Sequence, residues 1–216
     1  MTNKTKWLIY AIGGSAMVLL FFFFVFRGTD EYKVKLPVMS YVKPFSFINQ
    51  DSATVTLDQV KGKIYVANYF FVNCRGICPD MNGNLHTVYE KFKGNPQVAF
   101  LTHTCEPEND SVPALKEYAR LMDADGKQWQ FLTGDKLALY QAARESYKID
   151  DPHNNVGDIG DQFLHSQFLS LVDQMGRVRG VYDGLKRKEV SLLISDINML
   201  LAQGQEDGVL DKILSK

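Results

Sequence analysis

One uninterrupted apolar stretch dominates the beginning of the chain. Residues Trp7 to Phe26 (WLIYAIGGSAMVLLFFFFVF) include no charged side chain. A helix of this length, at about 1.5 Å per residue, spans roughly the 30 Å hydrocarbon core of a bilayer. A cleaved signal peptide has a shorter apolar region and ends at a small-residue cleavage site, and this stretch has neither feature. We therefore expect residues 1–28 to form a short cytoplasmic tip and a transmembrane anchor.

The charges that flank this stretch predict its orientation. Lys4 and Lys6 precede it, whereas Arg27 follows it and is soon countered by Asp30 and Glu31. Positively charged flanks favour the cytoplasmic side. We expect a single-pass protein of a bacterial inner membrane, with its C-terminal body on the periplasmic, extracytoplasmic side.

The rest of the chain has the pattern of a water-soluble α/β domain. Residues 29–44 are expected to form a polar tether, and residues 45–216 a domain with its own core. Apolar and polar positions alternate about a polar turn over residues 45–57, which predicts a hairpin. The dense β-branched and aromatic run Lys63–Val72 predicts a strand buried on both faces. Further strands are expected at residues 97–102, 128–132, 166–172 and 178–182, and helices after Pro79 and at residues 111–122, 136–147 and 188–202. This order predicts a mixed central sheet covered by helices on both faces.

Composition changes this picture little. Hydrophobic residues make up 45% of the chain and charged residues 23%, which are ordinary globular values. The formal net charge of −1 gives no reason to expect a nucleic-acid partner. The three cysteines are too few for a disulfide scaffold, and their odd number leaves one thiol outside any intrachain pair.

Two of the cysteines lie where the buried strand ends and a helix begins. Cys74 and Cys78 are four residues apart in NCRGICP, and Pro79 suits the first turn of a helix. A helix N-terminus stabilises a thiolate and lowers its pKa. The spacing places both sulfurs on one side of the first turn, where they could close a disulfide or bind one soft metal ion. It differs from the C-x-x-C spacing of thioredoxin-type redox enzymes.

A third ligand would have to come from another part of the chain. We expect His86 to be a surface or packing residue and His153 to be solvated, and His103 follows a strand and could lie near the site. His165 stands between a loop and a strand, from which it could reach the carboxyl ends of neighbouring strands, where open α/β sheets place their sites. Cys105 is expected to be a buried small hydrophobe rather than an accessory ligand.

Four segments together resemble the Sco/SenC family. They are the strand KIYVANYFF, the motif Cys74-x-x-x-Cys78-Pro79, the T-x-E-P-E-x-D segment from Thr104 to Asp110, and LHSQFLSLVDQMGRVRGVYDG from Leu164 to Gly184. The resemblance implies a thioredoxin-like fold behind one N-terminal transmembrane helix. It also implies a copper metallochaperone for cytochrome c oxidase assembly, in which Cys74, Cys78 and His165 hold one copper ion, Cu(I) or Cu(II). The implied partners are the copper-receiving subunit of a terminal oxidase and a thiol reductant.

Two positions depart from the family pattern. Leu164 precedes the expected ligand histidine, where the family often has aspartate, and the usual D-P-x-x-D segment begins here with Glu106. A carboxylate that orients the histidine ring must then come from another position, for which Asp161 is a candidate.

Other functions use the same cysteine pair. In a thiol-disulfide oxidoreductase, Cys74 would be the attacking thiol and Cys78 the resolving one, and the substrate would be the cysteines of a copper-site partner. A peroxiredoxin-like peroxidase fits less well because no T-x-x-C precedes Cys74. A ligand-free adaptor is the remaining alternative. An exported location is oxidising, so a reductant is needed before the pair can bind copper.

Overall fold

A computed structural model of the chain describes residues 2–26, 36–154, 157–164 and 166–214. The chain divides into two compact units, Met1–Lys35 and Leu36–Lys216.

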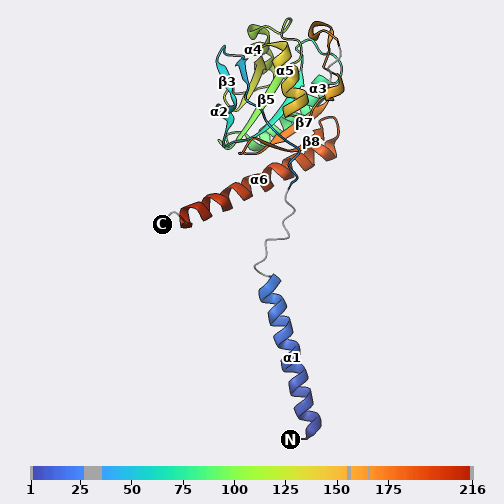
Figure 1. Cartoon of the computed structure of the whole chain (residues 1–216), viewed down its shortest axis with the longest axis vertical. Helices are drawn as coiled ribbons and strands as arrows, with labels where there is room; N and C mark the ends of the chain where they lie inside the picture. Colours follow the sequence, from blue (N-terminus) through green and yellow to red (C-terminus); the bar gives the residue numbers. More distant parts are fainter. Residues whose placement is uncertain (1, 27–35, 155–156, 165, 215–216) are drawn as a thin grey trace. The chain divides into compact units, whose positions relative to one another are not determined.

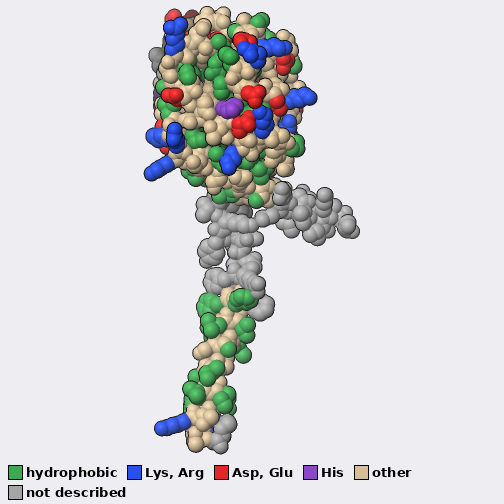
Figure 2. All heavy atoms as spheres, turned by 180° about the vertical axis from the view of Figure 1, so that it is seen from behind, with side chains coloured by type: hydrophobic (Ala, Val, Ile, Leu, Met, Phe, Trp, Pro, Cys, Tyr) green, Lys and Arg blue, Asp and Glu red, His purple; other side chains and the backbone are tan. Residues whose placement is uncertain are grey.

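The described part of the first unit is the helix α1 (Asn3–Phe26). Its segment Asn3–Phe23 has no buried residue, and it is the one helix among the described residues that is long and apolar enough to cross a membrane. Side chains as large as Trp7 and Phe21 are exposed along it, and in Figure 2 the coloured part of this helix shows hydrophobic side chains and no acidic ones. A helix that is apolar on all sides needs an apolar solvent, so α1 is a candidate membrane anchor.

The second unit is built on one eight-stranded sheet with the order β1-β8-β7-β4-β5-β6-β2-β3. Strands β4, β5 and β6 are parallel to one another, and the other neighbouring pairs are antiparallel. Figure 1 shows the strands in the middle of this unit with helices around them. The strands are β1 (Ser40–Tyr41), β2 (Ser46–Asn49), β3 (Thr54–Thr56), β4 (Ile64–Phe70), β5 (Val98–Thr104), β6 (Trp129–Thr133), β7 (Phe168–Val172) and β8 (Arg177–Asp183).

The helices lie on both faces of the sheet. They are α2 (Leu57–Val60), α3 (Cys78–Phe92), α4 (Val112–Leu121), α5 (Lys136–Gln141), which continues as a π-helical turn (Ala142–Ser146), and α6 (Arg187–Leu214). Apolar residues of α3, α4 and α6 belong to one buried cluster, and those of α2 and α5 to another.

Strand β4 separates the two clusters. All seven of its residues are buried. Val66 and Phe70 face the cluster of α3, α4 and α6, whereas Tyr65 and Ala67 face the cluster of α2 and α5. Successive side chains of a strand point to opposite faces, so the prediction of a strand buried on both faces is confirmed. The mixed sheet with helices on both faces is confirmed as well.

The short helix α2 was not among the predicted elements, and strand β1 and helix α6 also differ from the sequence prediction. Strand β1 lies inside residues 36–44, the end of the expected tether, and it pairs with β8. The amide of Met39 donates to the carbonyl of Val178 and the amide of Val42 to that of Gly176, both at 2.8 Å. Helix α6 extends beyond residue 202 to Leu214.

Candidate metal centre

The cysteine pair lies at the carboxyl end of β4. The chain leaves the strand at Phe70, passes Cys74 and enters α3 at Cys78, with Pro79 in the first helical turn. Strand β5 runs parallel to β4 and ends beside it, with Phe70 opposite Thr104. The loop after β4 and the loop after β5 therefore begin at the same edge of the sheet. The predicted position of the cysteines between a strand and a helix is confirmed.

A buried carboxylate fixes the start of the cysteine loop. Asp110, 1% exposed, accepts the backbone N–H of Val72 with its two oxygens at 3.2 and 3.1 Å. The hydroxyl of Thr104 donates to the same carboxylate. Ser111, the next residue, is the N-cap of α4. Nothing in the sequence signals that Asp110 reaches back to the loop after β4.

Both sulfurs are present as free thiols. Cys78 is 2% exposed, whereas Cys74 is half-buried. Burial and a hydrogen bond with the Cys74 thiol raise the pKa of Cys78 to about 12, although backbone amides act in the opposite direction. The expectation that the helix N-terminus lowers the thiol pKa is therefore wrong for Cys78, because removal of the sulfur from water outweighs the amide donors.

The third predicted ligand, His165, lies outside the described residues. Its sequence neighbours are described. The amide of Leu164 donates to the hydroxyl of Tyr140 at 3.1 Å, and the ring of Phe163 contacts that of Phe71 with the centroids 5.5 Å apart. Phe71 begins the loop that contains Cys74, so the segment just before residue 165 lies against the cysteine loop.

The other histidines lie in three different environments. His86 on α3 is half-buried, and its Nε2 lies 3.7 Å from Oε1 of Glu90. Together with Asp123 these residues form an acidic cluster, but the amine of Lys93 already pairs with both carboxylates at 2.8 and 2.9 Å. His153 is exposed.

His103 is fully buried, and its ring stacks on that of Tyr69 with the centroids 4.8 Å apart. Burial lowers its pKa to about 4. Its imidazole faces the cluster of α2 and α5, whereas Cys78 belongs to the cluster on the opposite face of the sheet. His103 therefore does not share a metal site with the cysteine pair.

Cys105 is separated from the pair by its packing. It is 2% exposed and belongs to the cluster of α2 and α5, whereas Cys78 belongs to the opposite cluster. Its thiol donates to the carbonyl of Phe70 at 3.1 Å, and burial raises its pKa well above the ordinary value. This environment fits the expectation of a buried small hydrophobe.

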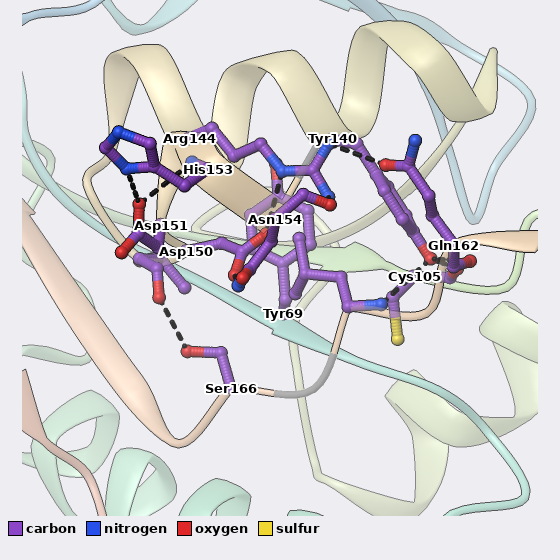
Figure 3. A network of polar contacts seen from close by, with 12 residues as sticks. Tyr69, Cys105, Tyr140, Arg144, Asp150, Asp151, His153, Asn154, Gln162 and Ser166 are labelled. Carbon is purple, nitrogen blue, oxygen red and sulfur yellow. Dashed lines mark hydrogen bonds and ion pairs between the residues drawn. The ribbon is translucent and has the colours of Figure 1, made fainter. Parts of the chain in front are cut away.

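A polar network holds the loop that leads to residue 165. The guanidinium of Arg144 donates to the carboxylate of Asp150 and to the side-chain oxygen of Gln162, with both donor–acceptor distances at 2.8 Å. Figure 3 shows these loop residues around the guanidinium. The hydroxyl of Tyr140 donates to the carbonyls of Cys105 and Gln162, at 2.9 and 3.3 Å. This network connects the loop before β7 to α5 and to the end of β5. Asp161, the candidate orienting carboxylate, is exposed in a short 3₁₀ turn of the same loop.

Comparison with known proteins agrees with this architecture. The SCO1/SenC family model matches residues 35–202. A SCO1 protein homolog of Bacillus subtilis is 31% identical over 190 residues, which cover 86% of this chain and 95% of the relative.

Two solved structures are similar in fold and sequence. BsSco, a member of the Sco family of cytochrome c oxidase assembly proteins in which a disulfide switch was identified, has a TM-score of 0.64 and 30% identity, over 76% of this chain and 96% of its own. Yeast Sco1 with copper bound has a TM-score of 0.56 and 26% identity, over 74% and 89% of the two chains. The fold class predicted from the sequence, a thioredoxin-like mixed sheet flanked by helices, is confirmed. The chain belongs to the SCO1/SenC family.

Proposed function

We propose that the chain is a membrane-anchored copper metallochaperone that delivers copper to a terminal respiratory oxidase. Cys74, Cys78 and His165 hold the ion, and the copper-receiving subunit of the oxidase accepts it. The observation that carries the proposal is the meeting of two free thiols at the start of α3. It is supported by membership of a family with cytochrome c oxidase assembly proteins and a copper-bound relative.

The donor set suits copper as a cargo. Thiolates select Cu(I), and an added imidazole allows the site to hold Cu(II) as well. Cys74 is half-buried, which leaves one side of the pair open for entry and transfer of the ion, whereas Cys78 is enclosed. Copper must displace the proton that burial holds on Cys78, so copper uptake becomes weaker as pH falls.

The membrane placement follows from α1 and its flanking charges. Lys4 and Lys6 precede the apolar helix and favour a cytoplasmic N-terminus. The folded unit then lies on the periplasmic side of the bacterial inner membrane, where thiols oxidise. A second partner, a thiol reductant, keeps Cys74 and Cys78 reduced before copper binds.

Copper titration of the whole chain in detergent tests the proposal. The reduced, anaerobic protein is expected to bind one copper per chain, and its Cu(II) form to show a sulfur-to-copper charge-transfer band in the visible region. Cys74→Ser or Cys78→Ser is expected to abolish the band, and His165→Ala to weaken copper binding sharply. His153→Ala removes an exposed imidazole from the preceding loop and serves as the matched control. Unchanged copper affinity in His165→Ala would exclude this histidine as a ligand.

A second candidate function is supported by the unequal exposure of the two thiols. Cys74 is accessible for attack on a partner's disulfide, and the enclosed Cys78 is placed to resolve the mixed disulfide. A thiol-disulfide oxidoreductase needs no third ligand. His165→Ala is therefore expected to leave disulfide exchange largely intact, and this variant separates the two functions.

A further inference from the structure

A group of exposed apolar side chains lies where the chain enters the second unit. Met39 and Tyr41, at strand β1, are 49% and 67% exposed, and Met175, in the turn between β7 and β8, is 71% exposed. The turn meets β1 because the amide of Val42 donates to the carbonyl of Gly176, and Tyr41 and Met175 border the same hollow. Single exposed apolar residues are normal on a protein, but adjoining ones mark a binding surface. We call these three side chains the entry patch.

The chain is fixed to the unit directly before the entry patch. The guanidinium of Arg179 donates to the carbonyls of Leu36 and Pro37, and it also donates to the carboxylate of Asp173 at 2.8 Å. Arg179 and Asp173 are 6% and 2% exposed, so this attachment is buried in the unit. Only residues 27–35 then connect the attachment to α1.

The reach of this connection decides which side of the unit can approach a membrane. Residues 27–35 lie outside the described residues, but at about 3.3–3.6 Å per residue they span at most about 30 Å. A compact unit the size of Leu36–Lys216 is about 40 Å across, and a path around half of it is about 60 Å. With α1 in a bilayer, the side at which the chain enters can therefore rest on the lipid, and the opposite side cannot.

Two lysines beside the entry patch match the charge of an anionic bilayer. Lys61 and Lys63 flank Gly62, whose amide donates at 3.0 Å to the carbonyl of Gln174 in the turn of the patch. Lys61 is exposed and Lys63 is half-buried. Asp58 on α2 is the exposed acid that lines the hollow, and the two lysines outnumber it. Apolar side chains together with basic ones bind the surface of a bilayer that contains anionic lipid.

We propose that the entry patch, with Lys61 and Lys63, rests on an anionic lipid surface and thereby orients the folded unit. The inference rests on the proposed membrane anchoring of α1. The patch lies at the edge of the sheet where β4 begins, because Tyr65 pairs with Val172, the last residue of β7 before the turn. The metal centre lies beyond the other end of β4, which has seven residues and is about 20 Å long. A unit that rests on the patch presents its cysteine pair away from the lipid, where a partner protein can reach it.

Quenching of tryptophan fluorescence by brominated lipid tests this contact. The parent protein is the whole chain with Trp7→Phe, whose remaining tryptophan, Trp129, is fully buried. It is reconstituted in vesicles of phosphatidylcholine and phosphatidylglycerol with acyl chains brominated near the headgroup. The tryptophan added by Met175→Trp is expected to be quenched. Leu137→Trp is the matched control, because Leu137 is 43% exposed and lies in the first turn of α5, at the sheet edge of the metal centre. It is expected to add no quenching to that of the parent.

The lysines give a second readout. A lysine near an anionic surface favours the contact by about fivefold. Lys61→Gln combined with Lys63→Gln is therefore expected to weaken the contact by about tenfold or more, and to lower the salt concentration that halves the quenching in Met175→Trp. Vesicles of phosphatidylcholine alone are expected to reduce the quenching as well. An unchanged salt midpoint in the lysine variant would overturn anionic lipid as the partner.

The outcomes separate this inference from the proposed anchoring. In the unaltered chain, quenching of Trp7 reports that α1 is in the bilayer, and its absence overturns the anchor together with the inference. If Trp7 is quenched but Met175→Trp is quenched no more than Leu137→Trp, the inference alone is overturned. Shielding of Met175→Trp from aqueous acrylamide without quenching by the lipid would show that another protein copy covers the patch, and this result also overturns the inference.

Discussion

The buried imidazole of His103 makes the stability of the folded unit depend on pH. The side chain lies in the cluster of α2 and α5, among the rings of Tyr69, Phe47 and Tyr147. Burial lowers its pKa from 6.5 to about 4. Between these two values the unfolded chain binds a proton that the folded chain excludes. The contribution of His103 to stability is therefore fully present above about pH 6.5 and is lost progressively as pH falls toward 4.

The magnitude follows from the two pKa values. Each unit of difference corresponds to about 1.4 kcal/mol, so the full effect is about 3 kcal/mol. Linkage over the part of the range between pH 7 and pH 5 gives a loss of about 2 kcal/mol in the free energy of unfolding. That is a large fraction of the stability of an ordinary domain.

Urea denaturation of the compact unit from Leu36 onward, at pH 7 and at pH 5, measures this loss. His103→Phe keeps an aromatic ring in the same place and removes the titrating group. The loss of stability between the two pH values is expected to be about 2 kcal/mol smaller in this variant than in the wild type. His153→Ala removes an exposed histidine and is expected to keep the wild-type difference. Equal pH dependence of wild type and His103→Phe would refute the reasoning.

Three further substitutions test other parts of the structure. Asp110→Ala leaves a loop amide and the hydroxyl of Thr104 without their buried acceptor, so we expect a loss of about 2–4 kcal/mol in unfolding free energy; unaltered urea stability would contradict this. Arg144→Met removes the ion-pair partner of the Asp150 carboxylate in a site where both side chains are mostly buried. The expected loss is about 3–5 kcal/mol, with faster proteolysis of residues 150–162, and an unchanged cleavage rate would argue against the anchoring role. Gly184→Ala places a methyl group 2.9 Å from a backbone oxygen and from a methionine side chain, and calorimetry should show a lower unfolding temperature, corresponding to about 1–3 kcal/mol.

Much of the fold could be predicted because its signals are local. The apolar run of β4 and the helical spacing after Pro79 place Cys74 and Cys78 at a strand-to-helix junction, and the structure confirms it. Strand β1 could not be predicted in the same way. It has two residues, and it exists because Met39, Ser40 and Val42 meet β8, which is far away in sequence.

The environment of the site was harder to predict than its position. The helix N-terminus at Cys78 suggested a low thiol pKa, but the degree of burial, which decides the sign, depends on tertiary packing. Asp110 gave no sequence signal of its role in the cysteine loop, because its partner Val72 is 38 residues away.

X-ray absorption at the copper edge tests the central claim most directly. The reduced whole chain in detergent is loaded with one equivalent of Cu(I) under anaerobic conditions, and the spectrum is compared with those of His165→Ala and the control His153→Ala. We predict two sulfur neighbours and one nitrogen neighbour in the wild type and the control, and loss of the nitrogen in His165→Ala. A copper environment without two sulfur neighbours, or one that is unchanged in His165→Ala, would contradict a site made of Cys74, Cys78 and His165.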